Sequence, residues 1–303
     1  MASLERSPAA VRGVVSATVC YLLWGAFPIF WKQLAAVDAR ELIAHRIAWS
    51  FVFAGVLASL VGGWGEIWTS LRSVRLCSLN LLSGSLLAIN WLVYVWGVNH
   101  GHILEMSLGN FLVPLSNVAL GCLVLRERLR PAQWLAIACA AAGVGWQLLR
   151  VGHLPWIALT LAITFGAYSL LRKCSPLGSL AGLTLEAALL LPAASAYLYW
   201  CHREGTGVLG RGSAWQHALV FSTGAVTTIP LILFVYGARR IRLATLGLLQ
   251  YMSPIVTFLV GVYVYHEKID GDLLASFAAI LVGLALYSID NLRALARPKP
   301  SNA

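Results

Sequence analysis

The chain has 303 residues, of which 59% are apolar and 11% charged, with a mean hydropathy of +0.77. Soluble domains carry about 25% charged residues, so the composition excludes an ordinary soluble protein and predicts one embedded in a lipid bilayer. The net charge of +10 does not indicate a protein that binds nucleic acid, because the basic residues form no stripe on a soluble element.

Ten apolar segments reach the ~20 residues that a helix needs to span a bilayer. They cover residues 12–31, 42–61, 77–98, 103–125, 132–149, 154–171, 180–200, 217–236, 243–265 and 273–290. The predicted fold class is all-α and integral to the membrane, with ten transmembrane helices. Residues 1–10 and 291–303 are predicted to be short tails, and no soluble domain is expected.

The positions of lysine and arginine predict the orientation. We number the two tails and the connections between segments in chain order, beginning with the N-terminal tail. The odd-numbered ones hold 15 of these residues and the even-numbered ones hold 7. Because positively charged connections stay in the cytoplasm, both termini are predicted to be cytoplasmic. The connection at residues 62–76 has two tryptophans and flanking arginines, and we expect it to lie on the cytoplasmic membrane surface.

The chain contains one pattern twice. The stretch 110–143 returns 140 positions later as 250–283, with a proline, a glutamate and several glycines in matching places. The stretch 24–32 returns 141 positions later as 165–173. A repeat of this length means that the chain consists of two homologous halves.

The predicted halves are residues 11–149 and 150–290, with five segments each. Five is an odd number, so the second half enters the membrane from the side opposite to the first. The halves are therefore inverted repeats, related by a pseudo-twofold axis in the membrane plane. This architecture is typical of secondary transporters, whose substrate site lies near the midplane between the halves.

Polar and aromatic residues at membrane depth predict a central cavity. Such residues belong at segment ends if they only anchor a helix in the interface, but these lie inside the segments. The candidates are Trp24, Asn90, Trp91, Tyr94, Asn110, Gln250 and Tyr251. Their lining would suit an amphipathic or aromatic organic ligand, with a cationic one among the options. The alternative is that they pack between helices through internal hydrogen bonds.

Three charged residues lie inside apolar segments, namely Arg46, Glu105 and Glu186. Arg46 and Glu186 occupy equivalent repeat positions, but inversion places them ~15 Å apart in depth, so they are not expected to pair. We expect Arg46 to pair with Glu105, and Glu186 to find a partner near the inner face among Arg172, Lys173, Arg242 and Thr245. These groups are either static pairs, which lower the cost of insertion, or groups that exchange protons or meet a cationic substrate.

Two prolines are candidate hinges. Pro114 and Pro254 occupy equivalent positions, and a proline inside a helix can bend it. They either open opposite faces in turn or form static kinks. The small residues at 136–145 and 275–283 permit close helix contact, and we expect their two helices to form a scaffold.

Enzymatic and cofactor signals are weak. His100 and His102 near Glu105 could suggest a metal site, but other ligands are not visible, so no metal is predicted. The sequence has no P-loop, and its six cysteines form no C-x-x-C pair. No catalytic residues and no cofactor are predicted.

The repeated motifs resemble two EamA domains of the drug/metabolite transporter superfamily. The resemblance rests on Trp24-Gly25, Phe165-Gly-Ala-Tyr168, Pro114 with Glu127-Arg-Leu, and Pro254 with Glu267-Lys-Ile. The stretches Ala44–Trp49, Asn90–Tyr94, Asn99–His102, Ser107–Gly109 and Gly247–Tyr251 resemble the RarD subfamily, which is labelled for chloramphenicol sensitivity. The chain departs from the subfamily pattern at Asn110, where an aromatic residue is expected.

The resemblance implies a permease of the bacterial inner membrane with ten helices and a central cavity. The predicted function is secondary transport of small organic metabolites or drugs by alternating access. The predicted partners are a small organic substrate, a proton as a further option, and the lipid bilayer, and the protein is expected to be a monomer. The alternatives are a receptor or assembly protein that does not transport, and a membrane enzyme that modifies lipids.

Overall fold

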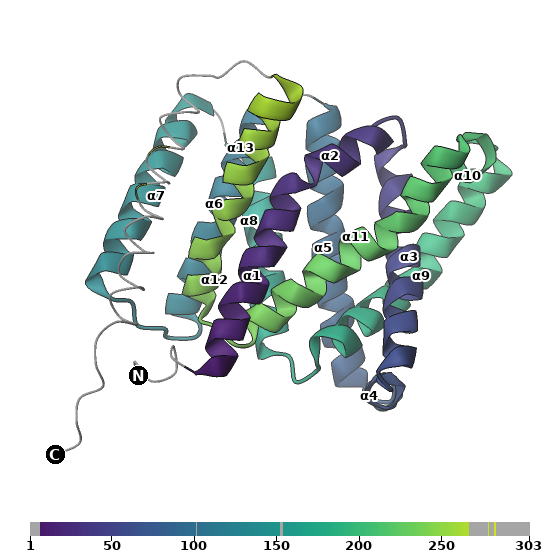
Figure 1. The fold of residues 1–303 in the computed structure, drawn as a ribbon, viewed down its shortest axis with the longest axis horizontal. Coiled ribbons are helices and arrows are strands. Elements are labelled where there is room, and N and C mark those ends of the chain that lie inside the picture. The colour runs from purple at the N-terminus through teal and green to yellow at the C-terminus, as the bar shows by residue number, and fades with distance from the viewer. Residues whose placement is uncertain (1–6, 101, 152–153, 267–277, 279–281, 283–303) are drawn as a thin grey trace.

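The computed structural model describes residues 7–100, 102–151, 154–266, 278 and 282. They fold into a bundle of helices (Figure 1). The helices are α1 (Pro8–Ala26), α2 (Pro28–Trp31), the 3₁₀ helix η2 (Lys32–Leu34), α3 (Ala39–Leu60), α4 (Trp64–Leu71), α5 (Val74–Asn99), α6 (Ile103–Leu123), α7 (Pro131–Val151), α8 (Trp156–Cys174), α9 (Ser179–Arg203), α10 (Val208–Arg211), α11 (Ala214–Ala238), α12 (Leu243–Gln250) and α13 (Met252–Tyr265).

Nine of the ten predicted segments coincide with helices of the described chain. In that part, seven helical stretches are long and apolar enough to cross a bilayer, and Leu108–Leu123 and Gln133–Trp146 are shorter apolar helices. The protein is therefore a multi-pass membrane protein. Segment 273–290 lies outside the described residues except for positions 278 and 282, so the total of ten helices stays a prediction. The scaffold role predicted for that segment also lies outside the description.

The predicted ninth segment is two helices. α12 ends at Gln250 and α13 begins at Met252. Pro254 lies in the first turn of α13, where its missing N–H costs no helical hydrogen bond. Pro114 instead lies inside the continuous helix α6. The two prolines thus hold equivalent sequence positions but different helical surroundings.

Two ends of the bundle can be distinguished. The short helix α4 lies between α3 and α5, and α10 lies between α9 and α11 at the other end of the bundle (Figure 1). We call these the α4 end and the α10 end. α4 carries Trp64 and Trp68, whose rings are 6.3 Å apart, and Trp68 is exposed. An exposed tryptophan on a short helix at the end of the bundle fits the predicted position on a membrane surface.

The contacts between helices reveal the pseudo-twofold axis. Helix α6 packs against its repeat equivalent α12, and α3 packs against its equivalent α9. The Tyr251 hydroxyl donates to the carbonyl of Phe111 at 3.1 Å, across 140 positions. A residue that touches its own equivalent lies beside the axis that relates them. The axis therefore passes between α6 and the α12–α13 junction, and also between α3 and α9.

Equivalent glycines bring equivalent helices close together. A Cβ atom added at Gly25 would lie 2.8 Å from the carbonyl oxygen of Ser253 on α13. A Cβ atom added at Gly166, 141 positions later, would lie 2.7 Å from Oγ of Ser116 on α6. The α1–α13 and α8–α6 contacts therefore repeat each other. Without a hydrophobic driving force between helices in lipid, such close packing stabilises their association.

A second pair of glycines joins the halves near the bundle centre. A Cβ atom at Gly224 on α11 would lie 3.0 Å from Cβ of Trp49 on α3 and closer still to the Trp49 carbonyl group. A Cβ atom at the equivalent Gly84 on α5 would lie 3.1 Å from a terminal methyl group of Leu190 on α9. Backbone cannot move aside as a methyl group can, so α3 and α11 form the tighter of the two contacts.

This difference predicts the stability of three variants. Gly224→Ala should lower the free energy of unfolding by about 1–3 kcal/mol, because the methyl group forces backbone apart. Gly84→Ala should cost less. Gly145→Ala on α7 is the control, since nothing lies within 4 Å of the added Cβ. Thermal unfolding of the purified proteins in detergent measures all three, and a Gly224→Ala protein as stable as the control contradicts the packing argument.

Candidate functional site

A cavity lies between helices α3, α5, α9 and α11, two from each half. It contains about 450 Å³ of unfilled space, counting its opening. It is lined by Ile47, Ser50, Ala54, Gly84, Leu87, Ala88, Trp91, Leu183, Glu186, Ala187, Leu190, Thr227, Thr228 and Leu231.

Ten of these fourteen lining residues form five pairs separated by 140 positions. The pairs are Ile47 with Ala187, Ser50 with Leu190, Leu87 with Thr227, Ala88 with Thr228, and Trp91 with Leu231. Equivalent positions of inverted repeats face each other only across their common axis. The cavity therefore lies on the pseudo-twofold axis, where α3 meets α9. Its location follows from the repeat, because both halves fold in the same way and present the same positions to the axis.

The cavity wall is apolar except for a few side chains. Leucine, isoleucine and alanine supply most of it, together with the Trp91 ring. The hydroxyl groups of Ser50 and Thr228 are buried and have no hydrogen-bond partner among the described residues. A buried hydroxyl without a partner loses free energy, so both are available to a bound molecule. The wall thus offers apolar area with a few polar groups, as small-molecule sites do.

Arg46 lies beside the cavity on α3. It is 8% exposed, and its Nε donates to Oγ1 of Thr227 at 3.2 Å. Its guanidinium carbon lies 3.7 Å from the ring centroid of Trp91 and 4.5 Å from that of Trp31. Two of these three partners, Thr227 and Trp91, line the cavity. A desolvated cation over an indole ring gains ~2 kcal/mol.

The predicted pair of Arg46 and Glu105 is wrong. Glu105 on α6 accepts a hydrogen bond from the backbone N–H of Ile157 at 3.2 Å, and its other oxygen lies 3.5 Å from Nδ1 of His102. It therefore caps the start of α8. Both residues lie about one turn from the same predicted membrane face, but equal depth does not determine which helices are neighbours. Helix α6 packs on α8, whereas α3 packs on α9 and α11.

Glu105 is one of four carboxylates in the first half that bind backbone N–H groups of the second. Glu41 accepts from Val208 at 2.6 Å, Glu66 from Gly178 at 2.9 Å, and Glu127 from Leu243 at 2.8 Å and Ala244 at 2.9 Å. Each acceptor satisfies N–H groups at the start of a helix, where a negative charge is stabilised. This explains Glu127 in the repeated motif, to which the sequence analysis gave no role. Its equivalent Glu267 lies outside the described residues.

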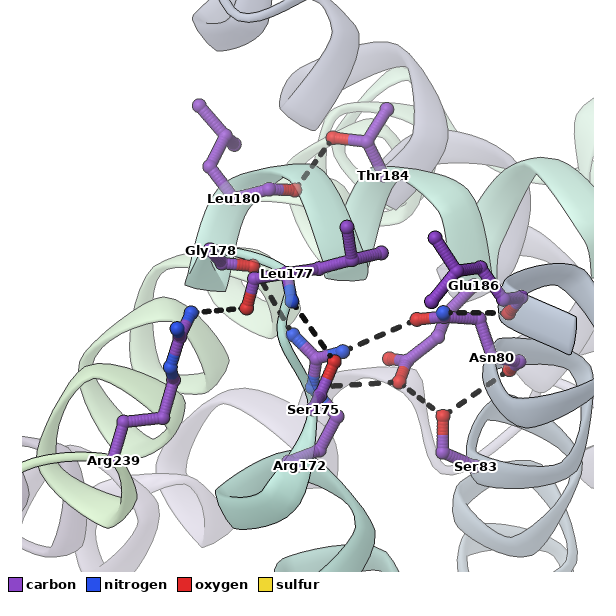
Figure 2. A network of polar contacts seen from close by, with 11 residues as sticks. Asn80, Ser83, Arg172, Ser175, Leu177, Gly178, Leu180, Thr184, Glu186 and Arg239 are labelled. Carbon is purple, nitrogen blue, oxygen red and sulfur yellow. Dashed lines mark hydrogen bonds and ion pairs between the residues drawn. The ribbon is translucent and has the colours of Figure 1, made fainter. Parts of the chain in front are cut away.

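Glu186 belongs to a buried polar network at the α4 end of the cavity, which Figure 2 shows. It accepts a hydrogen bond from the Ser83 hydroxyl at 2.5 Å, and Nε of Arg172 lies 3.6 Å from the same oxygen. Arg172 also donates to Oδ1 of Asn80 at 3.2 Å and to the carbonyl of Gly178 at 3.3 Å. Of the four candidate partners, Arg172 is therefore the one that pairs with Glu186. Ser83 was not among the candidates, because no sequence signal linked α5 to α9 at this height.

The other candidate partner, Lys173, has a different role. Its ammonium group donates to the carbonyls of Ala238 and Ile241 at the end of α11, and lies 3.9 Å from Glu127. It thereby satisfies carbonyl groups that the end of a helix leaves unpaired. Neighbouring residues on α8 thus point to different helices, and only the arginine reaches Glu186.

Several predicted cavity residues join helices in this structure. Asn90 donates to the carbonyl of Leu161 at 3.0 Å and to Oγ1 of Thr164 at 2.9 Å, both on α8. Gln250 accepts from Asn117 at 2.8 Å. With the Tyr251–Phe111 bond described above, these contacts correspond to the packing alternative. Of the seven predicted cavity residues, Trp91 lines this cavity.

The remaining predicted cavity residues are Trp24, Tyr94 and Asn110, and they lie outside the cavity wall. Trp24 packs edge-on against Tyr21 and Phe165, with ring centroids 5.7 and 5.6 Å apart. Tyr94 is 36% exposed, and Asn110 lies beside it. None of these three side chains lines the cavity.

The histidines near Glu105 have aromatic contacts. The ring of Trp96 stacks on those of His100 and His102, with centroids 4.3 and 5.4 Å apart. Within the described residues, no three His, Cys, Asp or Glu side chains lie close enough to hold a metal ion. The two histidines of the His-x-His pattern therefore pack against Trp96 in the turn that follows α5.

The fold and the cavity define a multi-pass helical membrane protein with a cavity between the two halves of its repeat. Comparison with known families agrees with this class. Residues 11–148 and 155–289 each match the EamA-like transporter family, and the chain belongs to that family. The two matched regions correspond to the two halves of the repeat.

Individual relatives place the chain near the RarD proteins. It is 43% identical over 294 residues to an uncharacterized transporter of Pseudomonas aeruginosa, covering 95% of this chain and 97% of that one. It is 39% identical over 279 residues to protein RarD of Escherichia coli, covering 92% and 94%. A solved crystal structure shares the fold with a TM-score of 0.68 at 21% identity, covering 93% and 98%. The chain is a RarD-type member of the family.

The buried network around Glu186 predicts a non-additive effect on stability. Arg172→Met leaves a buried carboxylate without its cation, which should cost about 3–5 kcal/mol of unfolding free energy. Glu186→Met leaves the arginine unpaired and should also destabilise. The double variant should be more stable than the sum of the two costs implies. Thermal unfolding of the four proteins measures the cycle.

Ser83→Ala is the matched control. It removes one hydroxyl contact without a charge and should cost about 1 kcal/mol. Strictly additive costs for Arg172→Met and Glu186→Met contradict a coupled ion pair.

Proposed function

We propose that the protein is a secondary transporter, which moves small organic molecules across the bacterial inner membrane by alternating access. The observation that supports this most is the cavity lined by equivalent positions of two inverted halves. When two such halves exchange their conformations, an opening at one face becomes an opening at the other. The family and the names of its relatives point to transport and not to an enzyme.

The α3–α11 contact and its equivalent, the α5–α9 contact, are not equally tight. We propose that the two contacts exchange their tightness when the protein changes state. Gly224 brings α11 against the backbone of α3, whereas Gly84 meets side-chain atoms of Leu190 and Glu186 on α9, of which a terminal methyl group of Leu190 is nearest. In the proposed second state the α5–α9 contact tightens and the α3–α11 contact loosens. The two states are then related by the pseudo-twofold axis, and each closes the path that the other opens.

The hinges proposed for this motion are Pro114 and Pro254, together with Tyr251 three positions before Pro254. Pro114 removes a hydrogen bond inside α6, and the break between α12 and α13 falls at Tyr251. Gly247 packs its backbone against the carbonyl group of Pro114. A bend at either point would therefore move both helices beside the axis. The closeness of these breaks to the axis supports the hinge proposal.

Accessibility labelling tests alternating access without a known substrate. All six native cysteines are replaced, and a single cysteine is introduced by Ala88→Cys or by the equivalent Thr228→Cys. A membrane-impermeant maleimide should reach each position from either side, in right-side-out and in inside-out vesicles. Labelling from one side under all conditions contradicts the exchange of states.

Flux into proteoliposomes tests transport. The probes are radiolabelled 3-phenylpropionate, phenylalanine and 3-phenylpropanamide, which share a body and differ in charge. At least one should enter faster than into protein-free liposomes, and Ala88→Trp should abolish the difference by filling the cavity. Val52→Trp on the exposed face of α3 is the control and should transport normally. Equal rates with and without protein for all three probes oppose the proposal.

The same flux measurement examines proton coupling. Glu105 caps α8, so Glu186 is the carboxylate that both lines the cavity and could exchange a proton. We propose Glu186 alone for that role. Transport by Glu186→Gln should lose its dependence on pH, whereas Glu105→Gln should keep it. An unchanged pH dependence in Glu186→Gln removes the role.

A further inference from the structure

Arg46 is a buried cation without a carboxylate partner in the described chain. The buried carboxylates there pair elsewhere: Glu41 lies 3.5 Å from His45, Glu105 3.5 Å from His102, and Glu186 3.6 Å from Arg172. The interactions of Arg46 are those with Thr227, Trp91 and Trp31. An unpaired charge in a membrane interior is costly and usually functional.

The repeat shows that this missing partner is specific to one half. Arg172 and Trp31 are equivalent, 141 positions apart, and Glu186 and Arg46 are equivalent, 140 positions apart. Arg172 contacts Glu186 in the second half, and Trp31 contacts Arg46 in the first. At these equivalent positions the second half has an ion pair with no net charge, whereas the first half has a tryptophan ring beside a single positive charge. The first half therefore places one uncompensated charge beside the cavity, against the lining residues Thr227 and Trp91.

The outer edge of the Arg46 guanidinium makes no hydrogen bond within the described residues. Indole rings face the group, and its Nε is occupied by Thr227. Its two terminal nitrogens have no partner among the described residues. That edge of an arginine matches a carboxylate with two parallel hydrogen bonds. The buried hydroxyls of Ser50 and Thr228, which lack partners, add two donors on the cavity wall nearby.

We propose that Arg46 binds the carboxylate of an amphipathic organic monoanion, whose apolar body fills the cavity. This inference rests on the proposed transport function and names the substrate class. One guanidinium balances one negative charge, and a second anionic group would meet Glu186 at the α4 end. An ammonium group finds no free carboxylate there, because Arg172 already neutralises Glu186. The apolar wall suits the rest of the molecule.

The unpaired charge of Arg46 favours an anionic substrate over the cationic one that the sequence suggested. That expectation came from the tryptophan rings, which attract cations. In the structure the Trp91 and Trp31 rings already hold the Arg46 cation. A substrate cation would have to displace it or be repelled by it, whereas an anion completes the site.

Ligand-induced thermal stabilisation tests the proposal with 3-phenylpropionate as the probe. The carboxylate should raise the unfolding temperature of the detergent-purified protein by a few degrees, on the order of 2–4 °C near saturation. The neutral 3-phenylpropanamide should not. Arg46→Gln should weaken the response to the carboxylate by roughly tenfold to hundredfold in concentration. Arg46→Lys keeps the charge but loses the paired geometry, and should respond in between.

Arg240→Gln is the matched control. Arg240 also lies over an aromatic ring, 3.3 Å from that of Tyr236, but it is exposed and lies away from the cavity. Its variant should respond like the wild-type protein. If Arg46→Gln does not fold, Thr228→Val provides the test, with a smaller loss of response to the carboxylate and none to the amide.

The outcomes separate this inference from the proposed function. An equal response to acid and amide, no response to the acid, or a full response in Arg46→Gln overturns the role of Arg46. If the proteoliposomes transport phenylalanine or the amide but not 3-phenylpropionate, transport stands and the monoanion is wrong. If nothing is transported while 3-phenylpropionate stabilises the protein through Arg46, the binding site stands and the transport proposal fails.

Discussion

Backbone N–H groups at the start of a helix need partners that a bilayer does not supply, and this protein supplies them across its two halves. Four carboxylates of the first half accept hydrogen bonds at helix starts in the second. Each satisfies the helix end and its own charge in one contact. These contacts fix α8, α9, α10 and α12 against the first half. Most acidic residues of the described bundle are therefore structural, and few remain for chemistry.

The pseudo-twofold axis then determines where the site can lie. Helices α3 and α9 meet on the axis, as do α6 and α12, and the cavity opens beside the first pair. Its lining contains five residue pairs from equivalent positions. Because the halves differ in sequence, the contacts at equivalent positions differ in strength, as Gly224 and Gly84 show. In the proposed mechanism, the unequal contacts of this framework are exchanged between the two halves, which would give the two related conformations that alternating access requires.

The sequence predicted what depends on hydropathy and on the repeat. Nine helical segments followed from apolar length, and depth in the membrane gave four candidate partners for Glu186, one of which is the observed Arg172. The pair of Arg46 with Glu105 failed because depth does not determine which helices are neighbours. Asn90 and Trp91 show a second limit. They are adjacent, but ~100° of helical rotation turns Asn90 toward α8 and Trp91 toward the cavity. Polarity alone could not separate them.

The equivalent positions Trp31 and Arg172 treat a buried charge in different ways. Pairing each buried charge would have been sufficient for a stable fold, and the second half does so with Arg172 and Glu186. The first half instead places indole rings around Arg46, which hold a cation without neutralising it. The positive charge of the first half is thus kept in position beside the cavity, next to Thr227 of the second half. A substrate that supplies the missing negative charge would be bound by both halves at once.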